Sequence, residues 1–109
     1  MTNVYKILGQ LDTAATTNET VYTVPGATSA IVSTISVCNT TASAITVRIY
    51  IIPSGGSAGV SKALVYDLSV PANDTYMCTA GITLGAGDFI QSYSSVAHAG
   101  VSVYGTEVS

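Results

Sequence analysis

Charged residues are scarce in this chain of 109 residues, and cations are the scarcest. Asp, Glu, Lys and Arg together make up 8% of it, against about 25% in an average globular protein. The three cations, Lys6, Arg48 and Lys62, are far apart in the sequence, and the formal net charge is −3. Binding to nucleic acid requires a basic patch that neutralises phosphates. We therefore predict no nucleic-acid partner.

Residues that carry catalysis or bind metals are also few. The single histidine, His98, sits among small residues with no partner indicated nearby, whereas a catalytic triad needs a base beside a nucleophile. One His and two separated Cys match no zinc-binding spacing, and the glycine-rich segment 54–62 lacks the P-loop spacing. We predict a protein that is not an enzyme, with no catalytic, cofactor-binding or metal-binding residues. A pair of carboxylates brought together by the fold, as in a glycosidase, stays open as an alternative.

Long apolar runs and cysteine pairs are absent too. No run approaches the roughly 20 apolar residues of a membrane helix, and the first ten residues do not read as a secretory signal. Two cysteines, Cys38 and Cys78, are too few for a disulfide scaffold. We expect no membrane partner and two reduced, partly buried thiols. A bond between the two cysteines stays open, because strands distant in sequence can be neighbours in a sandwich.

Hydroxyl and β-branched residues fill the place of the missing charge. The chain has 15 Thr and 13 Ser, and 48% of its residues are hydrophobic. This composition favours an all-β domain with branched residues on half-buried pleats and hydroxyls outside. A free monomer normally has a charged surface, and charge is depleted at the centre of interfaces. We therefore expect a homo-oligomer, with a monomeric Ser/Thr-rich sandwich as the alternative.

The segment Ala30–Ile52 carries the clearest pattern. Two apolar runs alternate with period two on either side of the short polar segment Asn39–Ser43, which predicts a β-hairpin. A five-residue loop would place Cys38 opposite Ala44 and Val37 opposite Ile45. The residues predicted to face inward are Ile31, Ile35, Val37, Ile45, Val47 and Ile49.

Turn signals divide the rest of the chain into short strands. Further strands are predicted at Thr20–Val24, Lys62–Val70, Thr75–Ala80, Ile82–Leu84, Phe89–Ser94 and Ala99–Tyr104, the last two as a pair. About eight short strands with turns every 8–12 residues predict an all-β fold, an antiparallel, jelly-roll-like β-sandwich. Residues 12–109 form its single domain. Residues 1–11 precede it as an N-terminal arm or edge strand.

The first eleven residues also provide the predicted interface. Val4, Tyr5, Ile7 and Leu8 precede any obvious core strand and are too few to form a core of their own. We predict that they contact a neighbouring subunit. The seven tyrosines are spread one per strand, which suits cross-strand packing or subunit contacts. Stacking of sugars on exposed tyrosines is the alternative.

Several segments, in this order and spacing, resemble a known family. They are Y-K-I-L-G-Q (5–10), V-Y-T-V-P-G (21–26), I-V-S-T-I-S-V-C-N (31–39), A-N-D-T (72–75), G-I-T-L (81–84) and V-S-V-Y-G-T-E (101–107). The chain resembles small all-β virion structural proteins of tailed bacteriophages of the cyanophage and marine-phage type. The resemblance implies a virion component, assembled in the host cytoplasm, with no catalytic residues to carry over.

Two functions are compatible with this resemblance. The first is a capsid decoration (cement) protein, a homotrimer that binds the major capsid protein or other virion proteins and stabilises the assembled head shell. The alternative is a tail or fibre component that binds a receptor or glycan.

Overall fold

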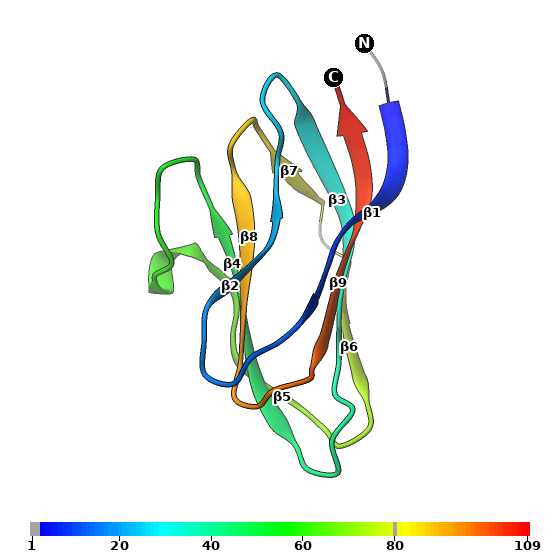
Figure 1. Ribbon diagram of the computed structural model, residues 1–109, viewed down its shortest axis with the longest axis vertical. Helices are drawn as coiled ribbons and strands as arrows, with labels where there is room; N and C mark the ends of the chain where they lie inside the picture. The colour runs from blue at the N-terminus through cyan, green and yellow to red at the C-terminus, as the bar shows by residue number, and fades with distance from the viewer. Residues whose placement is uncertain (1–2, 80) are drawn as a thin grey trace.

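The computed structural model describes residues 3–79 and 81–109 as two antiparallel sheets packed face to face (Figure 1). Within these residues there are nine strands and one short 3₁₀ turn, η1 (Val60–Lys62). Sheet A has the order β1-β9-β3-β6, and β7 also pairs with β3. Sheet B has the order β2-β8-β4-β5. The bounds are β1 Asn3–Asp12, β2 Glu19–Thr23, β3 Ser29–Cys38, β4 Ile45–Ile52, β5 Ala63–Val70, β6 Thr75–Cys78, β7 Ile82–Leu84, β8 Phe89–Ser94 and β9 Gly100–Val108.

The predicted antiparallel β-sandwich is confirmed, and the strands lie close to their predicted positions. The predicted strand Thr75–Ala80 is β6, and its last residue lies outside the described residues. Residues 1 and 2 of the predicted N-terminal segment also lie outside them. From Asn3 onward this segment is β1, an edge strand of sheet A that pairs with β9. Among the described residues, no helix has the length and apolar composition needed to span a bilayer.

The predicted hairpin is wrong, because β3 and β4 belong to different sheets. The chain leaves sheet A after Cys38 and enters sheet B at Ile45. Cys38 therefore lies opposite Gly100 and Thr75 rather than Ala44. The predicted pairing of the last two strands is wrong for the same reason, since β8 lies in sheet B and β9 in sheet A. An alternating apolar pattern requires one buried face, and a connection between two facing sheets provides it as well as a hairpin does.

One predicted core residue is also misplaced. Five of the six residues predicted to face inward are at most 2% exposed, but Ile31 is 48% exposed. The cause is a β-bulge at Ser33, the extra residue between the pairs Val32–Gly105 and Thr34–Tyr104. A bulge shifts the side-chain alternation by one residue, so Val32 takes the inward position and Ile31 turns outward. Gly105 is required here, because a Cβ at this position would overlap the carbonyl oxygen of Ile31.

The core lies between the sheets, and the two lateral edges of the sandwich differ. At one edge β1 packs closely against β2, because a Cβ on Gly9 would overlap the carbonyl oxygen of Val21. Leu8 and Leu11 of β1 pack against the core from this side. At the opposite edge, β5 of sheet B and β7 of sheet A leave an open groove between them.

The two cysteines are free and half-buried. They lie on the neighbouring strands β3 and β6, but Cys38 pairs with Thr75 and Cys78 with Ile35. A shift of three residues separates their Cα atoms by about 10 Å along the strands, beyond the roughly 7 Å that a disulfide can bridge. It also places the two side chains on opposite faces of sheet A.

Candidate interaction surface

The outer face of sheet A carries large apolar side chains and no charge across three rows of paired residues. Neighbouring strands in a sheet align such rows on one face. The rows are Tyr5, Thr106, Ile31 and Thr83; Ile7, Tyr104 and Thr34; and Gln10, Ser102, Ser36 and Met77. We call these eleven residues the uncharged face. Within it Tyr5 is 79% exposed, Met77 62%, Ile7 53% and Ile31 48%.

Two bulges produce this arrangement. Leu8 is the extra residue of β1, and Ser33 is the extra residue of β3, and both lie beside residues 103–105 of β9. The hydroxyl of Ser33 donates a hydrogen bond of 3.2 Å to the carbonyl oxygen of Tyr104. The bulge in β3 turns Ile31 outward, and the bulge in β1 turns Leu8 toward the core. The result is that Tyr5, Ile7, Tyr104 and Ile31 share the outer face of three neighbouring strands, with Thr106 between Tyr5 and Ile31.

The charged side chains lie outside these rows. Lys6 and Glu107 form an ion pair of 2.9 Å on the inward side of sheet A, and Arg48 and Asp67 form one of 2.6 Å on sheet B. Asp12 lies at the lower end of β1, where its Oδ1 is 3.1 Å from Nδ1 of His98. The other charged residues lie in turns, in η1 or on β2: Glu19, Lys62, Asp74 and Asp88. A partner can therefore exclude water from the uncharged face without burying an unpaired charge.

The predicted interface residues divide into two groups. Tyr5 and Ile7 lie on the uncharged face beside Thr106 and Tyr104, while Val4 is 43% exposed on the other side of β1. Leu8 is half-buried against the core. The sequence analysis missed Ile31, Met77 and Tyr104, because strand order decides which residues join β1 on one face. Gly105 was the one signal of the bulge that exposes Ile31.

A part-buried contact links the two sheets next to β1. The hydroxyl of Tyr22 donates a hydrogen bond of 2.6 Å to Oε2 of Glu107, whose Oε1 pairs with Lys6. Burial and the carboxylate of Glu107 raise the pKa of Tyr22. The hydrogen bonds from Tyr22 and then from Lys6 lower the pKa of Glu107. This charge is therefore fully paired inside the fold.

The outer face of sheet B holds a stacked cation. The guanidinium of Arg48 lies 4.3 Å from the ring centre of Tyr66 and 4.5 Å from that of Tyr93. Its Nε donates a 2.6 Å hydrogen bond to Asp67, which raises the pKa of Arg48. The charge is neutralised within the cluster, so this face is suited to local packing rather than to binding an anion.

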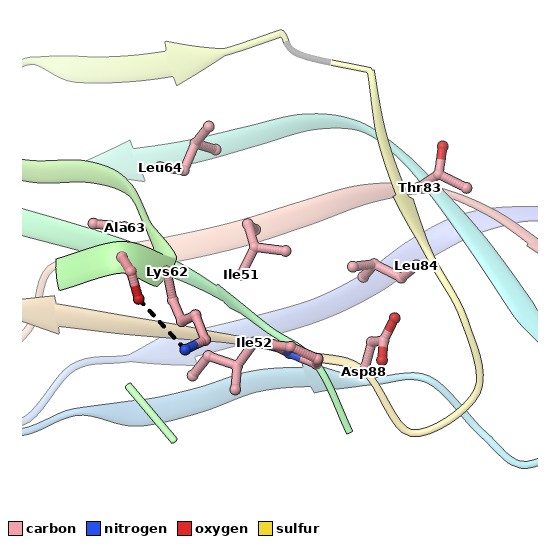
Figure 2. Close-up of a pocket in the computed structure, with 10 residues that line it drawn as sticks. Ile51, Ile52, Lys62, Ala63, Leu64, Thr83, Leu84 and Asp88 are labelled. Carbon is pink, nitrogen blue, oxygen red and sulfur yellow. Dashed lines mark hydrogen bonds between the residues drawn. The ribbon is translucent and has the colours of Figure 1, made fainter. Parts of the chain in front are cut away.

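The groove between β5 and β7 has apolar walls and two charged groups (Figure 2). Its volume is about 400 Å³, and Ile51, Leu64 and Leu84 supply its apolar lining. Lys62 lies 3.4 Å from the hydroxyl of Ser61. The carboxylate of Asp88 accepts hydrogen bonds from the backbone N–H groups of Ser54 and Gly85, at 2.9 and 2.8 Å. Both charged groups thus have partners of their own.

The fold brings together two titratable side chains, Asp12 and His98, that are far apart in the sequence. The pair of His98 and Asp12 is largely exposed, at 77% and 73% of the side chains. In residues 3–79 and 81–109 there is no group of three or more His, Cys, Asp or Glu side chains able to hold a metal ion. Of the surfaces described above, the uncharged face is the candidate site.

The comparisons with known proteins agree with the fold. No protein-family model and no curated protein sequence matches the chain. The chain is similar to a chain in the solved structure of infectious bursal disease virus, Gx strain, with a TM-score of 0.52 and 14% identity. The match covers 97% of this chain and 32% of that chain, so this chain spans about a third of its length. At this identity the likeness shows the β-sandwich fold.

Proposed function

We propose that the chain is a non-enzymatic structural protein of a virus particle, which decorates the assembled head shell of a tailed bacteriophage. The observation that carries this proposal is the uncharged face. It exposes Tyr5 and Ile7 on β1, Ile31 on β3 and Met77 on β6, all on one face of sheet A. Contiguous exposed apolar surface of this kind marks an interaction site.

The chemistry of the face suits a protein partner. Burying its apolar area contributes about 25 cal/mol per Å², and no charge must be desolvated in the process. The hydroxyls of Thr34, Ser102 and Thr106 lie between the apolar side chains, where they can hydrogen-bond to the partner. A protein that binds only the assembled lattice stabilises that lattice by mass action. This is the mechanism of a cement protein, with the major capsid protein as its partner.

Two further observations support the proposal. The similar chain belongs to the structure of a virus, infectious bursal disease virus. The sequence segments described above resemble phage virion proteins. In the proposal, the part of the uncharged face on β9, β3 and β6 (Tyr104, Ile31 and Met77) contacts the shell. The exposed residues of β1 (Val4, Tyr5 and Ile7) contact a second copy in a homotrimer.

Cosedimentation with assembled shells of the encoding virus tests the proposal. The variant Ile31→Glu places a charge on the uncharged face, so its affinity for shells should fall about tenfold or more. Val60→Glu is the matched control, because Val60 is 74% exposed and lies in η1, outside the face. It should bind like the wild type.

Two results would overturn the proposal. Equal binding of the Ile31→Glu variant and the wild type would exclude the uncharged face as the contact. If the wild-type protein does not bind shells but binds a cell-surface glycan, the receptor-binding alternative would replace the decoration function.

A further inference from the structure

The two lateral edges of the sandwich carry different apolar features, exposed side chains at one edge and a groove at the other. At one edge, Tyr5 and Ile7 are exposed on the outer face of β1 and Val4 is exposed on the opposite side of the same strand. The groove between β5 and β7 opens at the other edge. Sheet A begins with β1 and ends with β6 and β7, so the two surfaces lie on opposite sides of the molecule. They cannot meet within one chain, but they can meet between two copies.

The groove requires an apolar occupant. Its walls include Ile51, Leu64 and Leu84, and Leu64 at its rim is 39% exposed (Figure 2). Water in such a site has few hydrogen-bond partners and is easily displaced. The charged groups are one cation, Lys62, and one carboxylate, Asp88, so the groove carries no net charge.

The β1 edge provides apolar side chains that suit such a groove. Its exposed apolar residues are two aliphatic side chains and one tyrosine, and the cation between them, Lys6, is already paired with Glu107. The exposed acid of β1, Asp12, lies at the far end of the strand beside His98. This edge therefore also carries no net charge. When two charge-balanced apolar surfaces meet, no unpaired charge is buried. A nucleic acid or an acidic membrane surface would find no complementary charge on either surface.

We infer that the β1 edge of one copy occupies the groove between β5 and β7 of the next copy. The inference rests on the self-association that the proposed function includes, and it identifies the two surfaces involved. Such a contact joins two different surfaces, so it is heterologous and repeats head to tail, giving a ring where the rotation between copies closes and an open filament where it does not. A closed ring of three is the proposed homotrimer.

A ring would also strengthen binding to the shell, because it combines several contacts between copies of the uncharged face and the shell. Every copy in a cyclic ring has the same orientation relative to the ring axis. The uncharged faces are therefore presented equivalently, and a ring binds a repeating shell at several points. Several linked contacts raise the overall affinity without any new contact.

Complementation between two variants tests the inference. Tyr5→Glu disables the β1 edge and leaves the groove intact, whereas Leu64→Glu disables the groove and leaves the edge intact. Each variant alone should be a monomer by analytical ultracentrifugation. An equimolar mixture should form a dimer and nothing larger, because a single intact contact remains between the two variants. Val60→Glu should keep the wild-type mass.

Other results would overturn the inference. A Leu64→Glu variant that keeps the wild-type mass would show that the groove is not used. A mixture that stays monomeric, or a wild-type chain that is monomeric at all concentrations, would do the same. The shell-binding experiment is separate, so a monomer that binds shells would leave the proposed function standing. A ring that ignores shells would overturn only the proposed function.

Cross-linking provides a second readout that does not depend on disabling a contact. Tyr5→Cys and Leu64→Cys are each made in a background with Cys38→Ser and Cys78→Ala, then mixed and oxidised. The disulfide between the two different variants should form several-fold faster than links between identical variants. Rapid self-linking of Tyr5→Cys alone would instead indicate two β1 edges packed together, and would overturn the head-to-tail contact.

Discussion

The hydroxyl of Tyr22 donates a 2.6 Å hydrogen bond to the carboxylate of Glu107, across the space between the two sheets. Tyr22 belongs to β2 of sheet B and Glu107 to β9 of sheet A, so this bond links the sheets directly. It lies next to β1, whose Lys6 pairs with the same carboxylate. The contact therefore fixes the edge strand that carries the proposed interface.

Removing this hydroxyl should destabilise the fold. Hydrogen bonds to charged groups contribute about 1.5–3 kcal/mol, so Tyr22→Phe should lower the free energy of unfolding by about that amount at pH 7. Urea denaturation measures the change. Tyr5→Phe is the control, because Tyr5 is 79% exposed and its loss should leave stability unchanged. If Tyr22→Phe had the same free energy of unfolding as the wild type, the hydrogen bond would contribute nothing to stability.

The same bond predicts a pH dependence. The hydrogen bond from Tyr22 is the largest cause that lowers the pKa of Glu107 in the folded protein. A carboxylate of this kind stabilises the fold above its unfolded pKa of about 4.3, and the contribution is lost as the pH falls through the folded pKa. The stability difference between the wild type and Tyr22→Phe should therefore shrink on acidification below about pH 4. A difference that is constant from pH 7 to pH 3 would contradict this.

Truncation of two isoleucines on β3 should have very different effects on the free energy of unfolding. Ile35 is completely buried, so Ile35→Ala should cost about 2–5 kcal/mol in unfolding free energy. Ile31 is 48% exposed on the other side of the bulge, so Ile31→Ala should change stability by less than about 0.5 kcal/mol. Thermal or urea unfolding of both variants compares them. Equal costs would place both side chains in the core and rule out the bulge at Ser33.

This pair shows what could be read from the sequence. Period-two alternation placed the strands correctly, because a strand with one buried face needs that pattern whatever its partner. It could not decide that β3 and β4 cross between sheets, since a hairpin has the same pattern. It also did not locate the bulge, because nothing around Ser33 marks it as the extra residue, and the one signal, Gly105, lies on another strand.

The candidate surface was predictable only in part. The exposed apolar residues Tyr5 and Ile7 were visible as a short apolar string ahead of the core strands. Their neighbours Ile31 and Tyr104 are 26 and 99 residues further along the chain from Tyr5, and only strand order brings them together. The groove depends on two strands from different sheets, so it has no signature in the sequence.

Thiol titration tests the placement of the two cysteines. Because Cys38 and Cys78 are three residues out of register and point to opposite faces of sheet A, no bridge can join them within one chain. Protein unfolded without reductant should titrate as two free thiols. In the folded protein Cys38, on the outer face, should react faster than Cys78, which packs against the core. A single intramolecular bridge by mass spectrometry would overturn the register of β3 and β6.

The connection between the sheets depends on one buried side chain, Asn39. It is 1% exposed, and its Nδ2 lies 2.9–3.1 Å from the carbonyl oxygens of Ser43, Val70 and Pro71. Its Oδ1 accepts hydrogen bonds from the backbone N–H and the hydroxyl of Thr41. The amide thus joins the crossing segment to the end of β5, which explains why the chain crosses here instead of turning back.

Replacing the amide of Asn39 by a carboxylate should show how much its hydrogen bonds contribute to stability. In Asn39→Asp an anion would face three carbonyl oxygens and lose both N–H donors, so the unfolding free energy should fall by about 2–4 kcal/mol at pH 7. Protonation restores one donor, so the variant should recover part of this loss as the pH is lowered toward 4, relative to the wild type. Urea denaturation at several pH values measures both effects. Asn18→Asp, at an exposed position, is the control and should be neutral. If Asn39→Asp were as stable as the control, the amide would not hold the crossing, and the route of the chain between the sheets would need another cause.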